Sequence, residues 1–178
     1  IYIDGVNIEE YTLSSLREHI ATVLQDVFLF ADSIYNNITL KNPAITEEEV
    51  IAAAKSIGVH NFLMSLPEGY YYNVKERGVM LSAGQRQLIA FLRAYVHKPQ
   101  ILILDEATSS VDSHSEKLIQ EATDKMTEGR TSIIIAHRLT TVKKADRIIV
   151  LDKGKIVEIG NHEELLQIEN GYYRNLYE

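Results

Sequence analysis

The stretch ILILDEATSSVD, residues 101–112, decides the fold class. Four consecutive aliphatic residues are typical of a buried parallel strand, and two acids, Asp105 and Glu106, follow directly. In open α/β sheets, ligands collect at the carboxyl ends of the strands. Two neighbouring carboxylates repel each other and are costly to bury unless a cation or hydrogen bonds compensate. A bound Mg²⁺ would provide that compensation; the alternative is that both acids only cap the following loop.

The elements around this strand predict an α/β fold. The run SIIIA, residues 132–136, is predicted to be another buried strand, and a helix is expected between the two over about 114–127. IATVLQD, residues 20–26, is a third apolar run, and its β-branched residues predict a buried strand that ends at Gln25. Helical signals dominate from 28 to about 98. We therefore predict a parallel sheet with helices on its faces and an inserted helical subdomain.

Turn and cap signals divide the rest of the chain. Capping boxes are expected where Thr46 precedes Glu49 and where Asn161 precedes Glu164, which would start a final helix. A short helix is expected near 139–145, and RIIVLDKGKIVEIG, residues 147–160, reads as two strands joined by a hairpin turn at Asp152-Lys153-Gly154.

The amino-acid composition argues against several classes of function. The chain has 178 residues, no cysteine and a formal net charge of −7. Without cysteine there are no disulfides, thiol nucleophiles or thiolate metal sites. The acidic balance argues against non-specific binding of nucleic acid, which needs a cationic face. No apolar run reaches the roughly 18 residues of a membrane span, and the first residues lack the features of a signal peptide.

Two further polar residues follow apolar strands. His137 comes directly after SIIIA and would lie beside the same sheet edge as the acids, whereas the alternative is an ordinary loop histidine. Its place at a strand end distinguishes it from the other five histidines, which are His19, His60, His97, His114 and His162. Gln25 ends the third strand, where an amide can coordinate a cation weakly or hold a water, although most strand-end glutamines are loop residues.

The LSAGQ segment, residues 81–85, lies where a helix begins. Ser82 with Gln85 forms a capping box, and a plain helix cap needs no more than the serine. Ala83 and Gly84 are small enough to leave backbone N–H groups uncovered at a helix N-terminus. Such an end attracts phosphate through free donors and the helix dipole. The segment is therefore either a cap alone or a cap that also faces a phosphate.

In order along the chain, Gln25, LSAGQ, ILILDEATSSVD and His137 resemble the motifs of the ATP-binding-cassette (ABC) ATPases, specifically the nucleotide-binding domain of exporter-type transporters. The resemblance covers essentially the whole chain. VLQDVFLFADSIYNNI resembles the Q-loop segment, VKERGVMLSAGQRQLIAFLRA the X-loop followed by the signature motif, DEATSSVD the end of Walker B with the D-loop, and IIIAHRL the switch-histidine strand.

The resemblance implies ATP and Mg²⁺ as cofactors and assigns roles at the nucleotide. Asp105 would bind Mg²⁺ directly or through water, and Gln25 would link metal and water to a transmembrane partner. Glu106 would polarise the attacking water, and His137 would contact the γ-phosphate. Catalysis of this kind is mainly positioning and electrostatics.

The resemblance also implies partners, in a dimer with a second nucleotide-binding domain and in contact with transmembrane domains at the cytoplasmic face of a membrane. Ser82, Ala83, Gly84 and Gln85 would face a nucleotide held by the opposite subunit. Ser110 and Asp112 would communicate across that dimer, and Glu76 would face the transmembrane domains. Residues 1–27 and 99–178 would belong to the P-loop NTPase core, and 28–98 to the helical subdomain.

Two departures from the family pattern concern the binding of phosphate. Ala83 stands where the family usually has glycine, a change of one methyl that can weaken the approach of a phosphate. The phosphate loop G-x-x-x-x-G-K-[ST] does not occur: the one Gly-Lys pair is Gly154-Lys155, with Ile149 and Ile156 at the other two positions. We therefore expect a core incomplete at the N-terminus, with exposed strand edges, and an isolated chain that is inactive.

Two alternatives of function stay open. The chain would be a non-catalytic association module if it offers LSAGQ to a partner and turns over nothing. It would be a soluble ABC ATPase of DNA repair or translation if no transmembrane partner exists. The X-loop VKERG and the segment FLFADSIYNNI favour an exporter over the second alternative.

Overall fold

The computed structural model describes residues 1–105, 113–136 and 138–177. Four residues with predicted roles therefore lie outside the described residues: Glu106, Ser110, Asp112 and His137. The chain divides into two compact units, Ile1–Ile134 and Ile135–Glu178.

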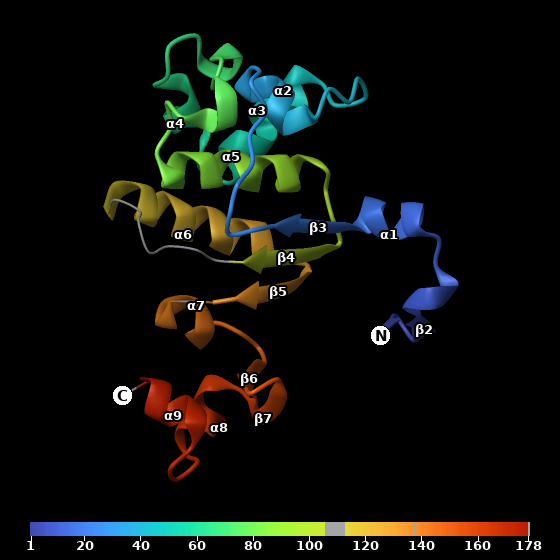
Figure 1. The fold of residues 1–178 in the computed structure, drawn as a ribbon, viewed down its shortest axis with the longest axis vertical. Helices are drawn as coiled ribbons and strands as arrows, with labels where there is room; N and C mark the ends of the chain where they lie inside the picture. Colours follow the sequence, from blue (N-terminus) through green and yellow to red (C-terminus); the bar gives the residue numbers. More distant parts are fainter. Residues whose placement is uncertain (106–112, 137, 178) are drawn as a thin grey trace. The chain divides into compact units, whose positions relative to one another are not determined.

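A parallel sheet organises the first unit. Its strands are β3 (Ile20–Val23), β4 (Ile101–Asp105) and β5 (Thr131–Ile135), in the order β3-β4-β5, and the three arrows point the same way in Figure 1. The predicted parallel sheet is confirmed. One boundary was wrong, because β3 ends at Val23 and not at Gln25, which lies in the bend that follows.

A small hairpin and a helix precede the sheet. β1 (Tyr2–Ile3) pairs antiparallel with β2 (Val6–Asn7), and Asp4 and Gly5 between them both have positive φ, as a tight turn requires. A 3₁₀ turn, η1 (Ile8–Glu10), and helix α1 (Leu13–His19), capped by Thr12, lead into β3.

The helical region lies between β3 and β4 in sequence. It contains α2 (Ile34–Thr39), α3 (Glu47–Ser56), α4 (His60–Met64), the 3₁₀ turns η2 (Gly69–Tyr71) and η3 (Glu76–Gly78), and the long helix α5 (Ala83–Val96). The predicted box of Thr46 and Glu49 caps α3. Helix α6 (Ser113–Thr127) follows β4 and ends before Gly129, which has positive φ.

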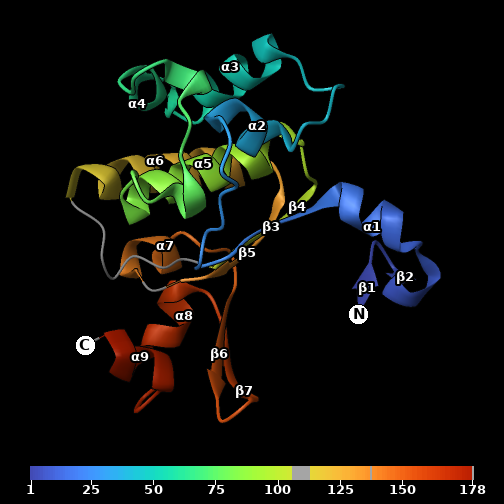
Figure 2. The same ribbon diagram turned by 45° about the horizontal axis from the view of Figure 1, so that its top comes forward.

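Helix α5 lies between the sheet and the smaller helices. It packs against β3 and α6 on one side and against α2 and α3 on the other, an arrangement visible in Figures 1 and 2. The core of the unit forms where these layers meet, and each fully buried aliphatic side chain contributes about 1.5–3 kcal/mol there. Its largest members include Leu29, Ile34, Ile38, Leu63, Leu88, Ile89, Phe91, Leu92, Leu102, Ile119 and Met126.

The sheet is buried on one face only. Leu102 and Leu104 are buried against the helices, whereas Ile133 and Ile135 of β5 remain 55% and 53% exposed. The expectation that β5 is a buried strand was therefore wrong, since its side chains alternate between half-buried and exposed.

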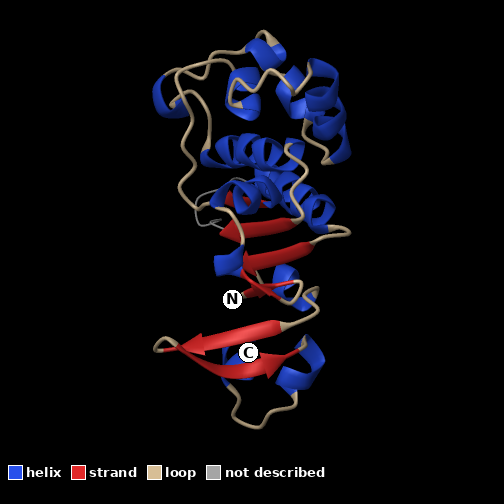
Figure 3. Ribbon diagram, turned by 90° about the vertical axis from the view of Figure 1, so that its right-hand side faces the viewer, coloured by secondary structure: helices blue, strands red, loops and turns tan. Residues whose placement is uncertain are grey.

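The second unit is built on an antiparallel hairpin. β6 (Ile148–Asp152) pairs with β7 (Lys155–Gly160), drawn as the two antiparallel arrows in Figure 3. The predicted turn is confirmed, with positive φ at Lys153 and Gly154. The unit also contains α7 (Leu139–Lys143), α8 (His162–Leu166) and α9 (Tyr172–Tyr177). Its small core joins Ile148, Val150, Leu165 and Tyr173.

The predicted box of Asn161 and Glu164 caps α8 in this unit. However, α8 is not the final helix as the sequence suggested, because α9 follows it.

Candidate functional site

Gln25 and Asp105 both lie at the carboxyl end of the parallel sheet. Val23 is the register partner of Leu104 in the parallel pairing of β3 with β4. Adjacent strands are about 4.8 Å apart, so the residues that directly follow these two lie at the same end of the sheet. Asp105 is the last residue of β4, and Gln25 follows Val23 by two residues in the bend after β3. Gln25 is exposed and Asp105 is half-buried.

Asp105 borders a small hollow on the helix-facing side of the sheet. Gln87 and Phe91 from α5 and Thr123 from α6 line it with Asp105, as do Leu104 and Ile134. Among the described residues, no group of three or more histidine or acidic side chains lies close enough together to hold a metal. The oxygen donors of Asp105 and Gln25 are nevertheless of the kind that Mg²⁺ prefers.

The LSAGQ segment forms the start of α5 as the sequence predicted. The hydroxyl of Ser82 accepts a hydrogen bond from the N–H of Gln85 at 3.2 Å, and the Oε1 of Gln85 accepts one from the N–H of Ser82 at 3.0 Å. Ser82 and Ala83 are exposed, whereas Gly84 is buried. An α-helix itself offers no acceptor to its first N–H groups, so the exposed N-terminus of α5 presents donors and a positive dipole end to solvent.

The loop before LSAGQ has an irregular backbone. Lys75, Arg77 and Gly78 all have positive φ, and Glu76 is exposed at the start of η3. Packing at Gly78 is also tight, because a Cβ on it would lie 3.0 Å from Cδ1 of Leu29. Val79 and Met80 follow with 69% and 64% of their surface exposed.

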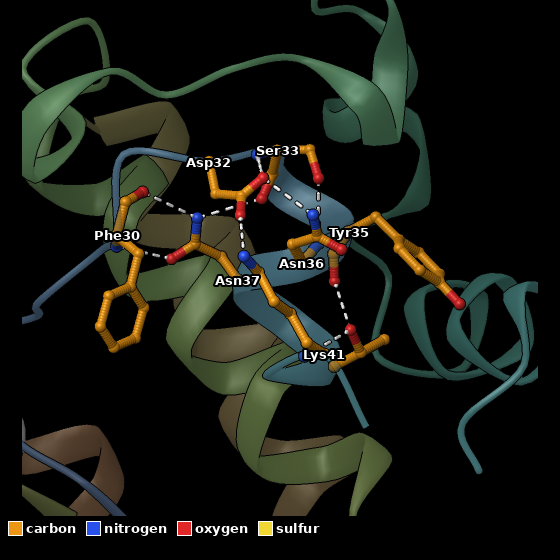
Figure 4. A network of polar contacts seen from close by, with 8 residues as sticks. Phe30, Asp32, Ser33, Tyr35, Asn36, Asn37 and Lys41 are labelled. Carbon is orange, nitrogen blue, oxygen red and sulfur yellow. Dashed lines mark hydrogen bonds and ion pairs between the residues drawn. The ribbon is translucent and has the colours of Figure 1, made fainter. Parts of the chain in front are cut away.

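A buried amide holds the segment that follows Gln25, as Figure 4 shows. The side chain of Asn37 is fully buried. Its Oδ1 accepts a hydrogen bond from the N–H of Phe30 at 2.8 Å, and its Nδ2 donates to the carbonyl oxygens of Phe30 and Ser33, both at 3.0 Å. Phe28 and Phe30 are exposed and stack edge to face with ring centroids 5.1 Å apart.

Asp32 anchors the start of α2 in the same network. Its Oδ1 accepts hydrogen bonds from Asn36 at 2.8 Å and from the N–H of Ser33 at 2.7 Å, and Lys41 lies 2.9 Å from its Oδ2. The hydrogen bond from Asn36, followed by that from Lys41, lowers the pKa of Asp32 to about 2. This carboxylate is therefore charged at any physiological pH.

Arginine 93 joins α5 to this segment. Its Nε donates to the carbonyl oxygen of Asn37 at 2.7 Å, and both terminal nitrogens lie 3.2 Å from the carbonyl oxygen of Phe28. Burial lowers the pKa of Arg93, yet a guanidinium keeps its charge in proteins.

Sequence reasoning missed Asn37 and Arg93, although a signal was present. Asn37 follows Ile34 by three residues, and Arg93 follows Ile89 by four, so both polar residues stand on the apolar stripe of their helix.

Comparison with known proteins shows which family this chain is similar to. Residues 1–109 match the family model described as ABC transporter. The chain is 49% identical over 172 residues to YgaD of Bacillus subtilis (strain 168), covering 97% of this chain and 30% of that protein. It is also 49% identical over 177 residues to SAOUHSC_02003 of Staphylococcus aureus (strain NCTC 8325 / PS 47), covering 99% of this chain and 30% of that protein. Both relatives are named as multidrug export ATP-binding/permease proteins.

A solved structure agrees with these relatives. A bacterial Atm1-family ABC exporter with ATP bound superimposes with a TM-score of 0.87 at 40% identity, covering 99% of this chain and 31% of that chain. The chain thus spans about 30% of the length of the curated relatives it matches. No helix in the described ranges is long and apolar enough to cross a membrane. Family model, relatives and fold agree that this chain belongs to the ABC transporter family, as part of an exporter-type ATP-binding domain.

Proposed function

We propose that this chain hydrolyses ATP as part of a complete nucleotide-binding domain and thereby drives export across a membrane. The parallel register of Val23 with Leu104 carries the proposal, because it brings Gln25 and Asp105 to one sheet edge. A carboxylate and an amide there supply the hard oxygen donors suited to a nucleotide-bound Mg²⁺. Such an ion, when bound, neutralises phosphate charge.

In this proposal the side chains at this end of the sheet contribute through where they are held. Asp105 holds a negative charge where the cation of a nucleotide would lie, and Gln25 offers its amide beside it. Glu106 accepts a hydrogen bond from the attacking water and so orients it in line with the γ-phosphate. His137 donates to an oxygen of that phosphate. These roles for Glu106 and His137 rest on the family motifs DEATSSVD and IIIAHRL.

The LSAGQ segment acts on a second nucleotide in this proposal. The exposed N-terminus of α5, with Ser82 and the backbone of Ala83 and Gly84, faces the γ-phosphate held by another nucleotide-binding domain. Gln85 keeps Ser82 in place through the capping box. Ser110 and Asp112 complete the contact between the two domains. Two sites are thus formed from two copies or two homologous domains.

Transmembrane domains are the third element of the proposal. The relatives are named as fusions of an ATP-binding part with a permease, which supports a location at the cytoplasmic face of a membrane. Gln25 and Glu76 are exposed and would both meet that partner. We assign 28–98 to a helical subdomain, and 1–27 with 99–178 to the ATPase core.

Glutamate 106 provides the decisive test. In the full-length protein that carries this chain, Glu106→Gln should nearly abolish ATP turnover and leave ATP binding intact, because only the orientation of water is lost. Glu128→Gln, which changes an exposed acid at the end of the following helix, is the matched control and should turn over ATP normally. Unchanged turnover in Glu106→Gln would contradict the role given to that residue.

A second candidate function applies to the 178 residues taken alone. They contain no G-x-x-x-x-G-K-[ST] sequence, which favours a non-catalytic association module that offers LSAGQ to a partner's nucleotide. ATP turnover by these residues in isolation, above that of the same chain with Glu106→Gln, would rule this candidate out.

A further inference from the structure

The guanidinium of Arg93 connects two parts of the chain that are far apart in sequence. It lies in the last turn of α5 and makes four contacts, of which three go to the carbonyl oxygens of Asn37 and Phe28. The fourth joins Nη2 to the Oδ1 of Asn37 at 3.3 Å. Each of these acceptors belongs to a neutral amide, so the contacts fix the geometry of backbone rather than pair two charges.

The segment that Arg93 holds has no regular structure of its own. Residues 27–30 form neither helix nor strand, so their conformation depends on contacts from outside. The carbonyl of Phe28 is held by Arg93, and the N–H and carbonyl of Phe30 are held by Asn37. Asn37 in turn is held by Arg93. One arginine therefore stabilises both ends of the exposed aromatic pair Phe28 and Phe30.

The same segment is tied to the loop that leads into LSAGQ. The side chain of Leu29 is fully buried and fills the space beside Gly78. Further along, the N–H of Val74 donates to the carbonyl of Asp32 at 3.1 Å, and the N–H of Ile34 donates to the carbonyl of Tyr72 at 3.0 Å. These contacts involve residues that precede LSAGQ in the sequence, whereas Arg93 follows LSAGQ on α5.

We propose that Arg93 is a positioning residue that makes α5 and residues 28–37 move as one body, so that a displacement of LSAGQ reaches the exposed pair Phe28 and Phe30. The inference rests on the proposed function, in which nucleotide engages LSAGQ. Arg93 follows Gly84 by nine positions, which is roughly 14 Å along a helix. The apolar stripe of α5 is buried against its neighbours, so the helix transmits a rigid displacement over that distance.

Hydrogen exchange in the full-length protein, reconstituted in lipid, tests the inference. A background of Glu106→Gln keeps ATP bound, and exchange is read at the amides of 28–37 and of 78–85 with and without ATP. With Arg93 present, ATP should slow exchange in both segments. With Arg93→Gln, ATP should still slow exchange at 78–85, while its effect at 28–37 should be largely lost.

Two further variants separate positioning from general loss of structure. Arg86→Gln is the matched control on the same helix, since the Nη1 of Arg86 donates to the carbonyl of Leu81 at 2.7 Å. It should loosen 81–82 and preserve the response of 28–37. Arg93→Lys keeps the charge and one donor group, and should restore part of that response if Arg93→Gln folds poorly.

The outcomes distinguish the inference from the proposed function. A full ATP response of 28–37 in both Arg93→Gln and Arg93→Lys would overturn the inference alone. A protein with Arg93 in which ATP alters neither segment would overturn the proposed function and with it the inference. A response that is lost in Arg93→Gln, partly restored in Arg93→Lys and kept in Arg86→Gln would establish the positioning role.

Discussion

Ser82 and Gln85 exchange hydrogen bonds at the start of α5, at 3.2 and 3.0 Å. Ser82 therefore has two roles to be told apart, one structural and one functional. The hydroxyl of Ser82 is a helix cap in this structure, and in the proposed function it also faces a phosphate. A substitution that keeps the first property and removes the second distinguishes them.

Ser82→Asp is that substitution. Aspartate caps helices as well as serine does, so the free energy of unfolding should change by less than about 0.5 kcal/mol. A carboxylate that faces a phosphate is repelled, so ATP turnover of the full-length protein should collapse. Ser82→Ala should instead lose about 1 kcal/mol of stability. Normal turnover in Ser82→Asp would show that the serine is a cap and nothing more.

The buried amide of Asn37 is expected to be among the most sensitive positions of the helical region. Asn37→Ala removes four hydrogen bonds, one of them from Arg93, and leaves the N–H of Phe30 without its partner inside the protein. We expect a loss of about 2–3 kcal/mol in the free energy of unfolding, measured with urea. Asn36→Ala, the matched control one residue earlier, breaks a half-exposed bond to Asp32 and should cost less than about 1 kcal/mol. Equal losses in the two variants would contradict this account.

The parts of the fold that were predictable from sequence are those set by local chemistry. The capping boxes at Thr46 and Ser82 and the turn at Gly154 depend on residues within four positions of one another, and all three are present. The contact of Arg93 with Asn37 spans 56 residues. No local pattern reports such a contact, although a charge on an apolar stripe marks the position where one is needed.

The candidate site was predictable to the same degree. Strand ends place Asp105 and Gln25 at one edge by a general rule of parallel sheets, but the register that aligns Val23 with Leu104 is a property of the folded chain. The exposure of Ile133 was not predicted from its apolar neighbours, because a continuous apolar run looks the same whether one face of the sheet or both are covered.

Acid should weaken the helical region through Asp32. The pKa of this carboxyl is about 2 in the folded protein, against an ordinary value of 3.8. A lowered pKa means that the charged form stabilises the fold at pH values above 3.8, and that this contribution disappears as the pH falls from 3.8 toward 2. Asp32→Asn should therefore show a flatter dependence of unfolding free energy on pH across this interval than the unchanged protein.

The side chains that lower this pKa can be separated by substitution. The hydrogen bond from Asn36 is the largest cause, and Lys41 acts through both a hydrogen bond and its charge. Asn36→Ala and Lys41→Met should therefore each raise the pKa of Asp32, as followed by NMR titration of the carboxyl carbon. An unchanged pKa in Asn36→Ala would mean that the charge of Lys41, rather than the hydrogen bond from Asn36, controls this group.

Helix α9 in the second unit depends on one carboxylate from β7. The Oε1 of Glu158 accepts a hydrogen bond from the N–H of Tyr172 at 2.6 Å, and Oε2 accepts one from the N–H of Tyr173 at 2.9 Å. The negative charge of Glu158 beside these N–H groups also interacts favourably with the positive end of the helix dipole. Gly171 leaves room for this contact, because a Cβ there would lie 3.0 Å from Oε1 of Glu158.

Glu158→Ala should therefore release the start of α9. Loss of two charge-assisted hydrogen bonds, each worth about 1.5–3 kcal/mol, should speed hydrogen exchange at 172–177 at least about tenfold. Glu158→Gln keeps one acceptor oxygen and should fall between the two, whereas Glu163→Gln, an exposed acid on α8, should change nothing in α9. If exchange at 172–177 stays unaltered in Glu158→Ala, α9 is held by the burial of Tyr173 rather than by its cap.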